Sequence, residues 1–146
     1  MKTRVLLILA GTLVFVFLGC SKSDTPTTPT TPTADTTAPP VPATLSPASG
    51  TTFNHFPRTL TLVWSAETDP STPVTYRVEI QFCQGSVSSP HDCVDDFYLG
   101  CDGVLPSTSC TFGFGGMNPG RWRVKAVDSA GNNSAFSAWS KFAFSI

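Results

Sequence analysis

Apolar residues recur at every second position in several stretches of this sequence, and this alternation limits what the chain can fold into. Turn-forming residues separate these stretches at intervals of 8 to 12 positions. Six stretches are expected strands of this kind, the third and fourth of them weaker: 60–64, 74–82, 97–99, 110–114, 121–126 and 142–146. Leu45 with its flanking Pro42 and Pro47 suits a short, irregular first strand. Strands of this spacing are typical of a sandwich or barrel. Only 13% of the residues are charged, which favours short strands over surface helices. The sequence therefore predicts an all-β fold of seven strands.

The N-terminal segment, residues 1–19, has the composition of a secretory signal. Lys2 and Arg4 give it a positive start, and Val5 to Gly19 is fifteen residues without a charge. A charged start followed by an apolar region directs export, and the apolar region is shorter than the roughly 20 residues that a transmembrane helix needs. We therefore expect residues 1–19 to be a signal peptide and the remainder to work outside the cytoplasm.

Residues 20–41 are predicted to be a disordered Thr/Pro-rich linker. The stretch from Asp24 to Thr44 holds nine Thr and six Pro in 21 residues, and it has no apolar pattern that could build a core. Pro-rich chains favour an extended polyproline II conformation of about 3.1 Å per residue. The linker is expected to be a spacer in front of one domain at 42–146, and O-glycosylation of its Thr residues is left open.

Four cysteines, Cys83, Cys93, Cys101 and Cys110, lie within 28 residues of one another. An even set in an exported domain indicates two disulfides, and three pairings are open to four cysteines. The local pairs Cys83–Cys93 and Cys101–Cys110 are favoured, and each would stabilise the fold by roughly 2.5 to 3 kcal/mol. We expect Cys83 to end a strand and Cys93 to precede the next one, so that the bridges staple two consecutive loops.

The motif Phe17-Leu18-Gly19-Cys20 resembles the lipobox of bacterial lipoproteins, although Phe17 departs from the usual Leu. The resemblance implies that Cys20 becomes the lipidated N-terminus, carrying palmitate or similar acyl chains, and that the protein is anchored to a membrane of the bacterial cell envelope. Ser21 resembles the outer-membrane sorting signal of that family, while the periplasmic or surface face stays open. The alternatives are an ordinary signal peptide with an unrelated Cys, and an uncleaved N-terminal anchor.

Residues 42–146 resemble fibronectin type III domains. The likeness is carried by the lead-in Pro42–Pro47, the strands Leu60–Trp64 and Tyr76–Ile80, the turn Asp69-Pro70, and the stretch Trp122–Asn132 with Trp139-Ser140 behind it. The resemblance implies a seven-stranded β-sandwich, which we expect to be monomeric. Gly120 departs from the family, because a corner Tyr is expected there. The four cysteines also depart from it, and we expect their disulfides to compensate.

The segment Phe136–Ser140 resembles the W-S-x-W-S box of cytokine-receptor domains, where aromatic rings interleave with arginines of a neighbouring strand. The resemblance implies a cation–aromatic ladder that reinforces the fold. Its expected members are Arg121, Arg123, Lys125, Phe136 and Trp139. Each stacked pair is worth about 0.5 to 1 kcal/mol at an exposed site.

The sequence offers no catalytic constellation. The only histidines are His55 and His91, and neither stands in a motif that supplies a nucleophile. The segment from His91 to Asp102 is rich in His, Asp and Cys, but it lacks metal-ligand spacing, and disulfides compete for its thiols. We therefore expect no catalytic site, no metal and no cofactor.

Charge and fold together limit the kinds of partner that the domain is expected to bind. Without the signal the chain has 7 basic and 10 acidic side chains, which argues against nucleic acid. Loops at the ends of a sandwich often carry recognition, and Phe97, Tyr98, Phe114 and Met117 could expose apolar area there, although core packing is favoured for most of them. The leading hypothesis is a non-enzymatic binding or adhesion module with a protein or glycan ligand. The alternative is a structural spacer or accessory subunit of an envelope complex.

Overall fold

The computed structural model describes residues 33–54, 59–96, 101–113 and 118–145, with the backbone alone for Asp95 and Asp96. The chain divides into two units, 1–32 and 33–146, and the described residues all belong to the second unit. These residues form eight β-strands. The strands are β1 (Thr44–Ser46), β2 (Thr51–Phe53), β3 (Thr59–Trp64), β4 (Thr75–Gly85), β5 (Pro90–Asp96), β6 (Ser109–Gly113), β7 (Gly120–Val127) and β8 (Ser140–Phe144).

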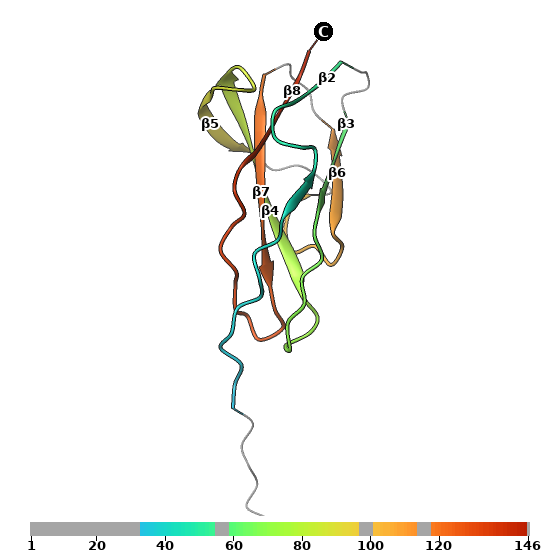
Figure 1. Ribbon diagram of the computed structural model, residues 1–146, viewed down its shortest axis with the longest axis vertical. Coiled ribbons are helices and arrows are strands. Elements are labelled where there is room, and N and C mark those ends of the chain that lie inside the picture. Colours follow the sequence, from blue (N-terminus) through green and yellow to red (C-terminus); the bar gives the residue numbers. More distant parts are fainter. Residues whose placement is uncertain (1–32, 55–58, 97–100, 114–117, 146) are drawn as a thin grey trace, which may run out of the picture. The chain divides into compact units, whose positions relative to one another are not determined.

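The strands form two sheets that pack together as a sandwich (Figure 1). One sheet has the strand order β1-β3-β6 and the other has the order β2-β8-β7-β4-β5. Neighbouring strands run antiparallel, except that β2 and β8 are parallel. The predicted all-β class is confirmed, and the strongest alternating stretches form β3, β4, β7 and β8.

The prediction of seven strands is wrong for the described part of the chain, because the sequence pattern misses β2 and β5. Strand β2 has three residues, too few to show an alternation. Strand β5 lies at the edge of its sheet and has the polar sequence PHDCVDD, which carries no apolar period. An edge strand pairs on one side only, and charged residues there discourage pairing with other chains. The strand expected at 97–99 lies outside the described residues.

The core consists of the inward-facing residues of both sheets. Burial alternates along β7: every second residue from Gly120 to Ala126 is buried, and the residues between them are partly exposed. Trp64 of β3 and Trp122 of β7 meet at the centre with ring centroids 6.3 Å apart, and Tyr76 of β4 packs edge-on against Trp64 at 5.6 Å. Burial of such rings dominates the energy of a small sandwich.

Gly120 allows β8 to approach β7 closely. A Cβ atom at this position would lie 2.4 Å from Cζ of Phe142, and Phe142 is fully buried in the core. The two residues face each other in the β7–β8 register. A larger residue at 120 would therefore displace the Phe142 ring.

Residues 33–43, called the strap below, pack against the sandwich, although most of them were expected to belong to the linker. Pro39 and Pro42 are buried. Ala43 exchanges two hydrogen bonds with Ser65, donating its N–H to Ser65 Oγ at 2.8 Å and accepting from the Ser65 N–H at 3.0 Å. The compact unit of the sandwich therefore starts at Thr33, and the strap meets it at the end opposite to β5 and the C-terminal end of β8 (Figure 1).

Candidate functional site

The outer face of the five-stranded sheet carries a stack of alternating cations and aromatic rings. The Arg121 guanidinium lies 4.3 Å from the Trp139 ring centroid, and the Arg123 guanidinium lies 4.3 Å from both the Trp139 and the Phe136 centroids. Lys125 Nζ lies 5.2 Å from the Phe136 centroid. The order along the stack is thus Arg121, Trp139, Arg123, Phe136 and Lys125. The structure brings together all five residues that the resemblance implied for the cation–aromatic ladder.

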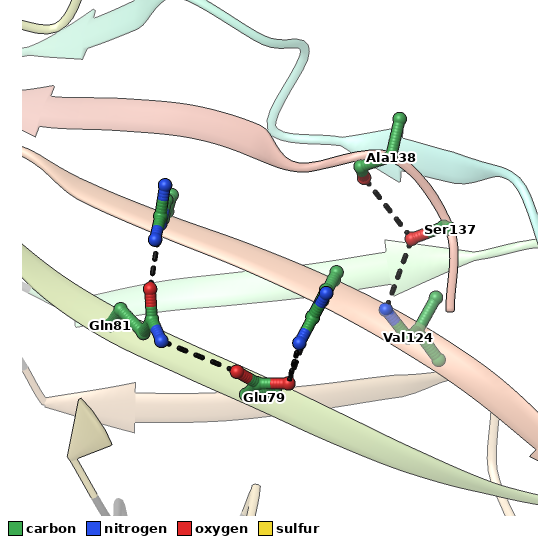
Figure 2. Close-up of polar contacts among 7 residues, drawn as sticks. Glu79, Gln81, Val124, Ser137 and Ala138 are labelled. Carbon is green, nitrogen blue, oxygen red and sulfur yellow. Dashed lines mark hydrogen bonds and ion pairs between the residues drawn. The ribbon is translucent and has the colours of Figure 1, made fainter. Parts of the chain in front are cut away.

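Two serines hold the ring-bearing segment against β7. The Ser137 N–H donates to the Val124 carbonyl at 2.8 Å. Figure 2 shows the second bond, in which Ser137 Oγ accepts from the Val124 N–H at 3.1 Å. Ser134 makes the same pair of bonds with Ala126, both of 2.9 Å. Each serine thus satisfies one N–H and one C=O on the edge of β7 beyond the end of β8. The two serines fix the segment that carries Phe136 and Trp139.

Strand β4 supplies polar partners for the two arginines. Arg121 Nε donates to Gln81 Oε1 at 2.7 Å, and Arg123 binds Glu79 Oε2 through Nε at 2.8 Å and Nη2 at 2.7 Å. Gln81 Nε2 in turn donates to Glu79 Oε1 at 3.3 Å, so the acceptors form one network (Figure 2). Each guanidinium therefore contacts a ring and also hydrogen-bonds to a side chain of β4.

Sequence reasoning misses these two partners because they stand on a distant strand. Gln81 faces Arg121 and Glu79 faces Arg123 in the β4–β7 register, some 40 residues apart along the chain. The only available signal is the alternation of polar residues on β4, which indicates an outward face without indicating the pairing.

Positive charge is concentrated on this outer face. Among the described residues, all Lys and Arg side chains belong to it: Arg77 of β4, Arg121, Arg123 and Lys125 of β7, and Lys141 of β8. Glu79 is the one carboxylate among the described side chains of these three strands. The term "outer face" is used below for this surface of β4, β7 and β8 with the ladder.

Both disulfides of the favoured pairing are present. Cys83–Cys93 links β4 to β5 with Cα atoms 4.0 Å apart, and Cys101–Cys110 links the chain before β6 to β6 itself with Cα atoms 5.3 Å apart. The expected place of Cys93 in front of a strand is wrong, because Cys93 lies within β5. The first bridge therefore joins two paired strands, whereas the second belongs to the hydrophobic core.

Three carboxylates meet where the strap reaches the sandwich. Oxygen atoms of Asp35, Asp69 and Asp128 lie within 4.8 Å of one another, an arrangement that could hold a cation. Hydrogen bonds account for their placement: Ser71 Oγ donates to Asp35, the Ser71 N–H donates to Asp69, and Asn132 binds Asp128 through its backbone and side-chain N–H groups. The bond from Ser71 Oγ holds the pKa of Asp35 below its usual value of 3.8.

Other predicted features are placed as follows. Asp69 has the expected role of a turn residue. His91 is exposed, with Nδ1 at 3.0 Å from Asp92 Oδ2. The disulfides occupy Cys93 and Cys101, so these two cysteines are not free thiolates for a metal. Outside the described residues lie Cys20, His55, Phe97, Tyr98, Phe114 and Met117, whose expected roles stay predictions.

Comparison with known proteins identifies no relative. No family model, no curated protein and no solved structure matches the chain. Within the described part of the chain, no helix is long and apolar enough to span a membrane. The site must therefore be interpreted from its own chemistry.

Proposed function

We propose that the protein is a non-enzymatic binding module that works outside the cytoplasm, held at a bacterial membrane, in particular the outer membrane, by lipid on Cys20. The observation that carries the proposal is the outer face, where all described Lys and Arg side chains gather and where Arg121 and Arg123 are held by rings and by partners on β4. Two disulfides in a domain of this size indicate an oxidising compartment. Among the described residues the one histidine, His91, is exposed and hydrogen-bonded to Asp92 rather than to a nucleophile.

The strand order supports membership of the fibronectin type III group. In immunoglobulin-like sandwiches the strands A, B and E lie in one sheet, and G, F and C lie in the other. Here β1-β3-β6 would correspond to A-B-E, and β8-β7-β4-β5 would correspond to G-F-C-C′. This assignment is part of the proposal, and fold by itself does not define function.

The alternative function is a structural spacer or accessory subunit of an envelope complex. A spacer needs stability and solubility, which are served by charges of both signs spread over the surface. The described cations all lie on one face of one sheet, and this arrangement serves neither stability nor solubility. This distribution favours a binding function.

The lipid anchor is tested by labelling cells that express the full chain with radioactive palmitate. We expect label on the wild-type chain and none on the Cys20→Ala variant, with the wild type fractionating with membranes and the variant released as a soluble protein. Alkylation of the purified chain without reductant should leave all four domain cysteines unmodified. Absence of label on the wild type, or free thiols in the domain, would refute the proposed location.

A further inference from the structure

The register of the five-stranded sheet places cations directly opposite each other on the outer face. Arg77 of β4 faces Lys125 of β7, and Arg121 of β7 faces Lys141 of β8. Side chains in such positions have Cβ atoms about 4.5 to 5.5 Å apart, and like charges there destabilise a sheet. The fold therefore maintains two repulsive pairs on one surface.

Carboxylates of the described residues do not neutralise these pairs. Arg123 is the one cation of the outer face with a carboxylate partner among the described side chains, namely Glu79. Arg121 is hydrogen-bonded to the neutral Gln81, and Lys141 Nζ donates to the Ser88 carbonyl at 3.5 Å. An anion above the outer face would relieve the repulsion in both pairs.

We propose that the outer face binds a linear anionic polysaccharide, whose carboxylate or sulfate groups lie across the rows of cations. The inference rests on the proposed extracytoplasmic binding function and names the ligand class of that same surface. Two residues along a strand span about 7 Å, so Arg121, Arg123 and Lys125 form a regular line of charge along β7. Arg77 and Lys141 widen this line on either side.

The composition of the outer face favours a charged chain over a protein partner. Protein interfaces take most of their energy from a few anchors that become buried, chiefly Trp, Tyr and Arg. The exposed large hydrophobic residues of the described part are Val41, Leu45, Val94 and Val104, and none of them lies on β4, β7 or β8. The rings of Phe136 and Trp139 are already covered by cations. Recognition on this surface therefore depends on charge and hydrogen bonds.

The cation–aromatic ladder prepares the surface for such a ligand. Free Lys and Arg side chains lose conformational entropy when a ligand immobilises them. Arg121 and Arg123 are already held by a ring and by a partner on β4. Less entropy is then lost on binding, and the positive charge stays concentrated.

The test measures binding of the full chain, purified in detergent, to polygalacturonate, to dextran sulfate and to neutral dextran. We expect binding to at least one of the two anionic polymers and none to neutral dextran, and the stronger anionic polymer distinguishes carboxylate from sulfate recognition. Arg77→Gln and Lys125→Gln should each weaken binding roughly 3- to 10-fold and reduce the slope of log affinity against log salt by about 1. The charge-matched control Lys22→Gln should bind like the wild type.

Thermal unfolding without ligand separates a ligand-binding role from a structural one. Arg77 makes no ion pair among the described residues, so Arg77→Gln should leave the melting temperature unchanged or raise it while weakening binding. No binding to either anionic polymer at low salt would refute the inference. Equal affinity for duplex DNA or for phosphatidylglycerol vesicles would refute the choice of polysaccharide, and equal weakening by Lys22→Gln would refute the assignment to the outer face.

Failure of this inference is distinguishable from failure of the proposed function. A chain that carries palmitate on Cys20 and closed disulfides, but binds no anionic polymer, keeps its proposed location and loses the ligand class. A chain without the label loses the proposed anchor whatever it binds.

Discussion

Arg123 is the central cation of the ladder, and its replacement by Ala tests how the outer face is held together. The side chain contacts the rings of Phe136 and Trp139 and forms the ion pair with Glu79. Arg123→Ala removes all three interactions at once. Glu79 is not left without a partner, because Gln81 Nε2 still donates to its carboxylate.

The expected loss of stability follows from these contacts. Each ring contact is worth about 0.5 to 1 kcal/mol at an exposed site. The ion pair adds roughly 0.2 to 1 kcal/mol, since the Arg123 and Glu79 side chains are 30% and 25% exposed and water screens their attraction. The free energy of unfolding should therefore fall by about 1 to 3 kcal/mol, which lowers the melting temperature of a domain of this size by roughly 4 to 12 °C.

Thermal and urea unfolding of the full chain measure this loss, with Arg77→Ala as the matched control. Arg77 has the same charge and lies on the same surface, but it has no ring contact or ion pair among the described residues. Its replacement should change the free energy of unfolding by no more than about 0.5 kcal/mol. If Arg123→Ala destabilises the protein no more than Arg77→Ala does, the ladder does not contribute to stability.

Three further perturbations test the core, the first disulfide and the strap. Gly120→Ala should destabilise the protein by about 1 to 3 kcal/mol in urea unfolding, because the new Cβ would overlap the Phe142 ring; combining it with Phe142→Leu should recover part of the loss. Replacing both Cys83 and Cys93 by Ala should lower the free energy of unfolding by roughly 2.7 kcal/mol, through the loss of a loop closed across ten residues; an unchanged midpoint would show that the bridge is not formed. Hydrogen bonding lowers the pKa of Asp35, so the carboxylate stabilises the docked strap above pH 3.8, and this contribution is lost as the pH falls through the lower folded value. A carboxyl ¹³C NMR titration with a midpoint at or above 3.8 would contradict this sign.

The buried faces of the main strands could be predicted because period two is a local signal. Leu60, Leu62 and Trp64 alternate within one strand, and each of them is buried. The ladder could be predicted only through the resemblance of Phe136–Ser140 to the W-S-x-W-S box, which implied that its rings stack on the cations of β7. Strand β5 could not be predicted from the sequence, because an edge strand of polar residues owes its conformation to pairing with β4 rather than to an apolar face of its own.

Features that depend on contacts between distant segments leave no local pattern in the sequence and could not be predicted from it. The carboxylates of Asp35, Asp69 and Asp128 come from the strap and from two loops, and only the folded chain brings them within 4.8 Å. The opposition of Arg77 and Lys125 likewise depends on the register of β4 against β7. A shift of β4 by one residue would turn Arg77 toward the core while Lys125 kept its place, so the buried residues of the two strands set the register, and the charge pairs follow from it.

The combination of stacking and repulsion on one surface bears on function. If Arg121 and Arg123 were free to move, their long side chains would spread apart and relieve much of the repulsion from neighbouring cations. The rings and the β4 partners prevent this movement, so the protein retains a dense positive surface at some expense of stability. A spacer gains nothing from such a surface, whereas a module that binds a polyanion gains a strong local field and less entropy to lose on binding. Under the proposed binding function, the ladder fixes charge for a ligand in addition to reinforcing the fold.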